Sequence, residues 1–485
     1  MSLKSKSKAA FFWASIQQVA IVILNLTISI LLARILQPEE FGLIGMLSIF
    51  IAIGRVLMSG GMGASIIRTQ LPTQRELSTI FYFNFTFSLI VYGVIFFLAP
   101  IIANFFERSI LEQLIRVYSL VIVIFSFSAV QFARLTQQMD FKLALKIKLP
   151  SIILGGISGL TFANFGFGVW SLIAMYLTQA LFDALQLWSR TKWRPSLVFD
   201  TDDFKKHFNF GYKISLYGIL DAIYNNINNL IIGKSFSAQT LGYYTRSYTL
   251  SNMPISNFQE VISKVTYPLL SSIQDDNSSL KLYYQKITQV TMIIIFPVMT
   301  LGVIIAEPLF VFFLTEKWLP AVPYFQLLCL SGFFIPLSSN NMNILKAKGR
   351  SSLIIKIGLA EKIIVGVGLF GAVYFGVYGL LIFLVIVSSI NFMIKSHLGG
   401  GLIKYGLILQ VKDFLIFFLI TSIVGFLTYL FFSFFFNEYS NIISIISSSL
   451  VFFILYALLL FFIKKSLLLE LYSFLAKKKL QKNNG

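Results

Sequence analysis

Four polar residues share one face of a helix predicted near the middle of the chain. Asp221, Asn225, Asn228 and Asn229 are spaced by 4, 3 and 1 positions within the helix predicted over 208–233, and such spacings place side chains on one helical face. The Asp221 carboxylate could supply oxygen ligands to Na⁺ or take up a proton. The three asparagines are candidates for binding a polar substrate. The alternative is that they make hydrogen bonds between helices.

Two arginines lie at related places in other predicted helices. Arg55 falls in the helix predicted over 41–67, and Arg246 in the one predicted over 239–263. A guanidinium group presents a planar fork of donors that suits phosphate oxygens and stays charged at any working pH. We therefore expect Arg55 and Arg246 to bind an anionic substrate group, and the alternative is a structural ion pair.

Glu361 is a second candidate for ion coupling, because it is a carboxylate inside the apolar helix predicted over 353–374. Its neighbour Lys362 offers the alternative of an ion pair at the end of that helix.

Signals for enzyme chemistry are weak. Asp200, Asp202 and Asp203 form a DxD pattern that could hold a metal ion, but they directly precede a predicted helix, where acidic residues cap the start. His207 and His397 are far apart in sequence, and Cys329 is the single cysteine. No phosphate-binding loop of the Walker type is present. We predict no catalytic residues, no metal site and no cofactor apart from coupling to Na⁺ or H⁺.

These residues must be positioned by elements that are almost entirely apolar. Hydrophobic residues make up 57% of the 485 positions and charged residues only 12%, and a stretch of about 20 apolar residues spans the hydrocarbon core of a bilayer. The sequence therefore predicts an all-α polytopic membrane protein with about fourteen transmembrane helices. They are predicted over 11–35, 41–67, 79–104, 113–133, 149–164, 168–189, 208–233, 239–263, 287–306, 319–345, 353–374, 378–394, 414–434 and 441–463.

The net charge of +19 is distributed unevenly between the two sides of these helices. Of the 39 lysines and arginines, 31 lie in the two tails or in and beside every second loop, and only Arg34, Arg108, Lys234 and Lys317 lie in or beside the opposite loops. Loops rich in lysine and arginine stay in the cytoplasm. We expect both termini in the cytoplasm, contact with anionic membrane lipid, and no binding of nucleic acid.

Part of the sequence is repeated at an offset of 210 residues. Eight of thirty positions are identical between 143–172 and 353–382, among them Lys146, Gly156, Phe165 and Gly166. Phe41-Gly42 also parallels Leu241-Gly242, here at an offset of 200 residues. A repeat of six helices predicts two parallel bundles related by a pseudo-two-fold axis. The predicted boundaries are a first bundle over 1–190, a basic linker over 191–206, a second bundle over 207–396, two further helices over 397–463, and a basic tail over 464–485.

Several short motifs carry a family resemblance. They are Trp13, the pattern Leu32-Ala33-Arg34-x-Leu36-x-Pro38-x-x-Phe41-Gly42, Gly61-Met62-Gly63, Trp193-Arg194-Pro195, Leu241-Gly242-Tyr243-Tyr244, and Tyr267-Pro268-Leu269-Leu270-Ser271 followed by Asp275. In combination the sequence resembles the Wzx-like polysaccharide transport family of bacterial flippases, within the multidrug/oligosaccharidyl-lipid/polysaccharide exporter superfamily. The resemblance covers the first twelve predicted helices. Ser59-Gly60 stands where members of the family often carry an acidic residue.

This resemblance implies a protein of the bacterial cytoplasmic membrane that moves an undecaprenyl-pyrophosphate-linked oligosaccharide between leaflets by alternating access. It also implies Na⁺ or H⁺ coupling and work alongside other polysaccharide assembly proteins. The alternatives are an ion-coupled multidrug antiporter of the same superfamily and, in another class, a membrane-embedded glycosyltransferase or polysaccharide polymerase. The two deep arginines disfavour the antiporter, since they would repel cationic drugs. The short outer loops disfavour the enzymes.

Overall fold

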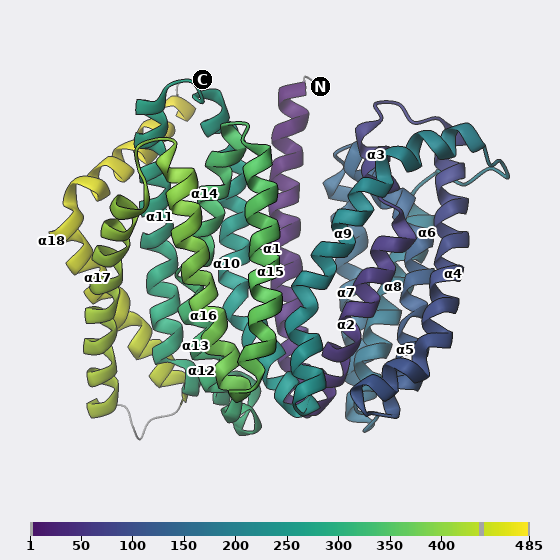
Figure 1. Ribbon diagram of the computed structural model, residues 1–485, viewed down its shortest axis with the longest axis horizontal. Coiled ribbons are helices and arrows are strands. Elements are labelled where there is room, and N and C mark those ends of the chain that lie inside the picture. The colour runs from purple at the N-terminus through teal and green to yellow at the C-terminus, as the bar shows by residue number, and fades with distance from the viewer. Residues whose placement is uncertain (1–2, 436–440, 484–485) are drawn as a thin grey trace. The chain divides into compact units, whose positions relative to one another are not determined.

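The computed structural model describes residues 3–435 and 441–483, and every regular element in these ranges is helical. Each predicted span coincides with one helix or with two or more consecutive helices. Ten helical segments in the described ranges are long and apolar enough to cross a membrane. The prediction of an all-α polytopic membrane protein is confirmed, and a count of fourteen is consistent with the helices observed (Figure 1).

The chain divides into two compact units, residues 1–245 and 246–485. This border lies inside one helix, α10 (Ala238–Ser272), and the predicted bundle boundaries stay a prediction. The other helices of the first unit are α1 (Leu3–Ile35), α2 (Pro38–Ser59), α3 (Met62–Arg68), α4 (Gln74–Phe106), α5 (Ile110–Tyr118), α6 (Leu120–Gln137), α7 (Phe141–Asn164), α8 (Trp170–Arg190) and α9 (Thr201–Ser235).

The second unit holds the rest of α10 and the helices that follow it. These are α11 (Asn277–Ile304), α12 (Ala306–Leu314), the 3₁₀ helix η1 (Glu316–Ala321), α13 (Val322–Gly332), α14 (Ile335–Ala347), α15 (Ser351–Val373), α16 (Gly376–Lys395), the π-helical turn η2 (Ser396–Gly400), α17 (Leu407–Phe435) and α18 (Asn441–Asn483).

The sequence repeat corresponds to a repeated structure. The segment 143–172 lies in α7 and α8, and 353–382 lies in α15 and α16; in both cases two helices are joined by a short connection containing Phe-Gly. Gly166 and Gly376 both adopt positive φ, at 80° and 74°. A residue without a Cβ takes this conformation at no steric cost. The identical glycines therefore turn the chain in the same way in the two repeats.

Glycines also bring α2 into backbone contact with its neighbours at both ends. A Cβ on Gly42 would lie 1.7 Å from the carbonyl oxygen of Ala238, at the start of α10. At the other end, a Cβ on Gly61 would lie 2.1 Å from the carbonyl oxygen of Gly211 in α9, and Gly61 itself has a φ of 69°. Only glycine allows helices to approach so closely.

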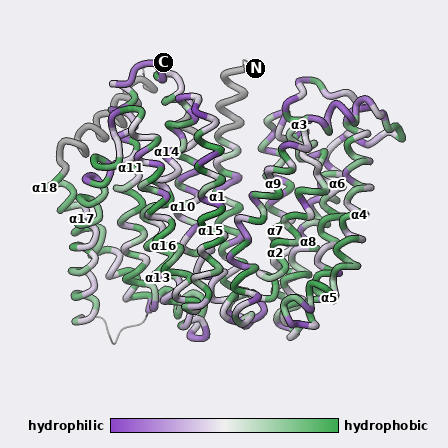
Figure 2. The backbone as a smooth tube through the Cα atoms, in the orientation of Figure 1, coloured by the Kyte–Doolittle hydropathy of each residue, from purple (hydrophilic) through white to green (hydrophobic). Residues whose placement is uncertain are grey.

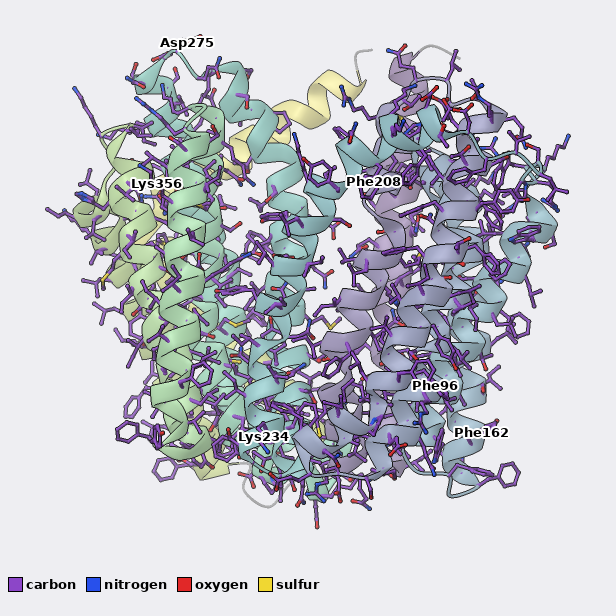
Figure 3. All side chains as sticks on the ribbon, turned by 45° about the vertical axis from the view of Figure 1, so that its right-hand side comes forward. Phe96, Phe162, Phe208, Lys234, Asp275 and Lys356 are labelled. Atoms are coloured by element: carbon purple, nitrogen blue, oxygen red, sulfur yellow. The ribbon has the colours of Figure 1, made fainter. Side chains whose placement is uncertain are left out.

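Polar residues gather at the ends of the helices of the first unit. The hydrophobic colour follows most of α4, α6 and α8, and the hydrophilic colour gathers beside α3 (Figure 2). Phe208 lies toward one end of these helices, whereas Phe162 and Lys234 lie toward the other (Figure 3). From Phe162 to Phe208 and on to Lys234, the chain therefore passes from one end of the unit to the other and back, as successive membrane spans require. At the Lys234 end, the Lys234 Nζ lies 2.6 Å from the Glu107 carboxylate, which keeps the net charge of that end low.

Candidate functional site

The asparagines of α9 divide between two kinds of contact. The Asn229 Nδ2 donates to the Ser48 Oγ of α2 at 3.1 Å, and the Ser48 Oγ in turn donates to the Asn226 Oδ1 at 2.9 Å. The Asn228 Nδ2 donates to the hydroxyl of Tyr244, on α10, at 3.0 Å. These bonds connect α9 to α2 and α10, as expected of asparagines that act between helices.

Asn225 points elsewhere. Its Nδ2 donates to the Asp221 Oδ2 at 2.9 Å, one helical turn earlier on α9. Asn225 is exposed and Asp221 is half-buried. The structure thus brings Asp221 and Asn225 together as an accessible carboxylate and amide, and the remaining oxygens of the pair are the type of ligand that Na⁺ takes.

Arg55 lies on α2, within the candidate membrane span Pro38–Ser59, and its side chain is exposed. Its guanidinium carbon lies 5.5 Å from the centre of the Phe125 ring of α6, which is within the range of a cation–π contact. Arg55 forms no ion pair with any residue that the structure describes. The guanidinium is therefore held by a ring face while its donors stay available.

Arg246 belongs to the second unit and lies half-buried on α10. The next residue fixes this stretch of α10, because the buried Ser247 Oγ donates to the carbonyl oxygen of Ala321 at 2.8 Å. The roles predicted for Arg55, Arg246, Asp221 and the asparagines in binding substrate or ions stay predictions.

Glu361 is engaged by a neighbouring helix. Its Oε2 lies 2.8 Å from the Lys395 Nζ, and its Oε1 accepts from the Asn391 Nδ2 at 2.9 Å. Both partners lie on α16, and Lys395 is buried. The structure therefore places a partly buried ion pair between α15 and α16, where the sequence alone had offered only Lys362. The role of Glu361 in ion coupling stays a prediction.

Two other buried carboxylates lie within the helices. Asp183 of α8 is paired with Lys148 of α7. Asp413 of α17 lies just before the span predicted over 414–434, so the sequence did not mark it as a residue inside the membrane. Its Oδ2 accepts from the Tyr405 hydroxyl at 2.6 Å and from the amides of Gln289 and Gln285 at 3.0 and 3.2 Å.

The acidic residues before α9 cap the helix. The Asp200 Oδ1 accepts from the backbone amides of Asp202 and Asp203, at 3.0 and 2.9 Å. Because these bonds favour the charged form, they lower the pKa of Asp200. The Asp203 Oδ2 accepts a hydrogen bond from the Arg75 Nε at 2.7 Å. The interpretation of the DxD pattern as a helix cap is confirmed.

Glu76 links the start of α4 to α9. It closes a capping box with Thr73, and its Oε1 lies 2.6 Å from the Lys206 Nζ and 3.4 Å from the Nε2 of the buried His207. The His207 Nδ1 lies 2.7 Å from the Ser65 Oγ of α3. Burial lowers the pKa of His207, although the Glu76 carboxylate opposes this shift. The two groups hold α3, α4 and α9 together.

A family described as polysaccharide biosynthesis protein matches residues 31–323, which is more than half of the chain. The chain belongs to this polysaccharide biosynthesis protein family. The resemblance found in the sequence motifs is thereby confirmed. The matched region contains α2 to α12, and with them Arg55 and Arg246.

Two relatives match this chain along most of its length. The teichuronic acid biosynthesis protein TuaB of Bacillus subtilis is 26% identical over 432 residues, covering 86% of this chain and 87% of the relative. The lipopolysaccharide biosynthesis protein WzxC of Escherichia coli is 26% identical over 427 residues, covering 86% of each chain.

Solved structures of two transporters share the fold. The lipid II flippase MurJ in an inward closed conformation superposes with a TM-score of 0.69 at 18% identity, covering 92% of this chain and 98% of MurJ. An inward-facing multidrug transporter of the MATE family gives a TM-score of 0.60 at 17% identity, covering 81% of this chain and 98% of that one. The chain thus shares its fold with these two transporters, as the sequence motifs implied.

Proposed function

We propose that this protein is a flippase that moves undecaprenyl-pyrophosphate-linked oligosaccharide units across the bacterial cytoplasmic membrane for surface polysaccharide synthesis. Family membership supplies the context, since the similar proteins are named for teichuronic acid and lipopolysaccharide biosynthesis and for succinoglycan transport. Within this context the chain is a transporter rather than an enzyme. Its partners are the lipid-linked substrate and other proteins of polysaccharide assembly.

One observation carries the proposal. Arg55 lies within a membrane span, exposed, stacked on Phe125, and outside any ion pair with the residues described. A charge in the hydrocarbon region costs several kcal/mol unless a partner or a water-filled space relieves it. A pyrophosphate offers several acceptor oxygens to such a guanidinium. The same charge would repel a cationic drug, which disfavours the multidrug antiporter.

Deletion of the gene in its own bacterium tests the proposal. A flippase deletion should abolish the surface polysaccharide while intact lipid-linked oligosaccharide accumulates on the cytoplasmic side, and the wild-type gene on a plasmid should restore both. Loss of the lipid-linked oligosaccharide itself would indicate an enzyme of its synthesis. Normal polysaccharide together with new sensitivity to cationic drugs would indicate the antiporter.

The topology predicted for this flippase places both termini in the cytoplasm. A fluorescent reporter fused after Gly485 should then be fluorescent, and an alkaline phosphatase fusion at the same place should be inactive. The opposite pattern would contradict the topology derived from the charge distribution.

A further inference from the structure

A pocket of about 230 Å³ lies in the first unit, and neither Arg55 nor Asp221 lines it. The end of α6, the start of α7, the end of α8 and the residues after α8 form its walls. This is the lysine- and arginine-rich side of the unit. The residues that matter here are Gln131, Arg134, Asp140, Arg190, Lys192 and Trp193.

Two residues that line this pocket each carry a buried donor without an acceptor in the part of the chain that the structure describes. Gln131 is 1% exposed and Trp193 is 7% exposed. Neither the Gln131 Nε2 nor the Trp193 Nε1 finds a hydrogen-bond partner among the residues that the structure describes. The Gln131 Oε1 accepts from the Thr191 hydroxyl at 3.1 Å, so the carboxamide is held with its oxygen already engaged. An unsatisfied buried donor costs about 1–3 kcal/mol, and a ligand with acceptor oxygens would remove that cost.

The charges around the two donors favour an anion. Arg134, Arg190 and Lys192 line the pocket against a single carboxylate, that of Asp140. The Asp140 Oδ1 is engaged in capping α7, where it accepts from the Leu143 amide at 3.0 Å. Arg134 lies with its guanidinium carbon 5.6 Å from the centre of the Trp193 ring. Three cations and one anion leave the lining with a net charge of +2.

The position of the pocket indicates where the anion comes from. Trp193 lines it and packs in one cluster with Trp188, and the lining residues 134–143 and 190–193 fall between predicted spans at the basic end of the helices. Basic pockets between helices at this depth suit the phosphate of a lipid headgroup. We propose that the pocket binds the phosphate group of a lipid in the leaflet at the basic end of the helices. This inference does not depend on the proposed function.

Native mass spectrometry of the purified full-length protein with added phosphatidylglycerol tests the proposal. The Trp193→Phe variant removes one N–H and keeps the ring, and it should weaken phosphatidylglycerol binding by about threefold to tenfold. A triple variant with Arg134, Arg190 and Lys192 changed to Gln should weaken it by about tenfold or more. The matched control changes three exposed lysines of the same unit, Lys142, Lys205 and Lys213, to Gln, and it should bind as the wild type does.

Two further arms identify the source of the phosphate. If the lipid is required, inorganic phosphate should not displace phosphatidylglycerol, and phosphatidylcholine, which carries no net charge, should bind more weakly. Displacement by millimolar inorganic phosphate would overturn the assignment to a lipid. Equal binding by the wild type, the triple variant and Trp193→Phe, with unchanged melting temperatures, would overturn the site itself. Should the triple variant fail to fold, Trp193→Phe alone decides.

Discussion

Gly42 and Gly242 occupy corresponding positions in the two sequence repeats, and each lies against the backbone of the other's helix. A Cβ on Gly42 would lie 1.7 Å from the Ala238 carbonyl oxygen, and a Cβ on Gly242 would lie 1.8 Å from the Pro38 carbonyl oxygen. The starts of α2 and α10 are therefore in reciprocal backbone contact. This contact explains why the Phe-Gly and Leu-Gly pairs recur in the repeats.

The Gly42→Ala variant should be destabilised, because the added methyl group meets a backbone oxygen that no side-chain rotation can move. We expect a loss of about 1–3 kcal/mol in the free energy of unfolding, measured by thermal or SDS-induced unfolding in detergent. Gly93→Ala in α4 is the control, since a Cβ there meets nothing within 4 Å. Equal stability of the two variants would contradict the close approach of α2 and α10.

Neutral variants of Arg55 or Arg246 should reach the membrane yet lower the output of surface polysaccharide by about tenfold or more, as expected for the loss of hydrogen bonds to a charged group. Arg55→Lys should restore activity only in part, because lysine keeps the charge and loses the bidentate geometry. Arg68→Ala is the control. Arg68 is also exposed and stacked, 4.6 Å from the Phe210 ring, but it ends the short helix α3. Normal polysaccharide in a double Arg55→Ala and Arg246→Ala variant at normal protein levels would show that both arginines are structural.

Asp221→Asn should uncouple transport from the ion gradient, because it removes the charge and keeps the shape that Asn225 contacts. The measurement is transport in cells or vesicles with and without an imposed Na⁺ or H⁺ gradient. Asp202→Asn, in the exposed first turn of the same helix, should retain the dependence. If Asp221→Asn transports normally and still responds to the gradient, Asp221 does not couple ions.

Replacing Glu361 by Gln should destabilise the protein, because it leaves Lys395 buried without its counter-charge. Loss of one partner of a buried ion pair costs about 3–5 kcal/mol, and the exposure of Glu361 places the expected value at or below the low end. The double variant Glu361→Gln with Lys395→Gln should be more stable than Glu361→Gln alone. A double-mutant cycle in detergent measures the coupling energy. Additive effects would show that the two residues do not act as a pair.

The stability of the protein should fall as the pH is lowered below the ordinary pKa of histidine, about 6.5, because of His207. Burial lowers its pKa in the folded state, so the unfolded chain binds the proton first and the folded state loses stability as the pH falls from there toward the lowered pKa. Above the ordinary value the contribution is constant. The melting temperature at pH 5.5 and 7.5 should therefore differ less for His207→Gln than for the wild type. Glu76, Lys206 and Asp203 surround the ring and are unchanged in this comparison.

The elements of this protein were predictable because a bilayer imposes a strong and local constraint. A helix that crosses it must be apolar for about 20 residues, so most spans could be identified from composition alone. The segments α9 and α10 are too polar to count among the apolar spans, yet they follow the alternation of basic loops. Phe165-Gly166 is repeated as Phe375-Gly376, and both glycines adopt a positive φ, which a residue without a Cβ takes at no steric cost.

Partners were not predictable, because the position of a residue on a helix fixes the face that it occupies and not the helix that it meets. The spacing of Asp221, Asn225, Asn228 and Asn229 placed all four on one face, but only the tertiary structure showed that Asn228 and Asn229 bond to neighbouring helices while Asn225 stays with Asp221. The sequence offered Lys362 as a possible partner of Glu361, and the packing of α15 on α16 adds Lys395.

The pocket beside Trp193 shows the same limit. The sequence places Trp193-Arg194-Pro195 in a basic linker, where its arginine and lysine neighbours account for topology. That the Trp193 and Gln131 donors are both buried without an acceptor among the described residues follows only from the meeting of α6, α7 and α8. Local sequence determined the lengths, charges and turns of this protein, because each depends on a few adjacent residues. Tertiary structure decided which polar groups are satisfied, because a hydrogen bond depends on the positions of two distant segments at once.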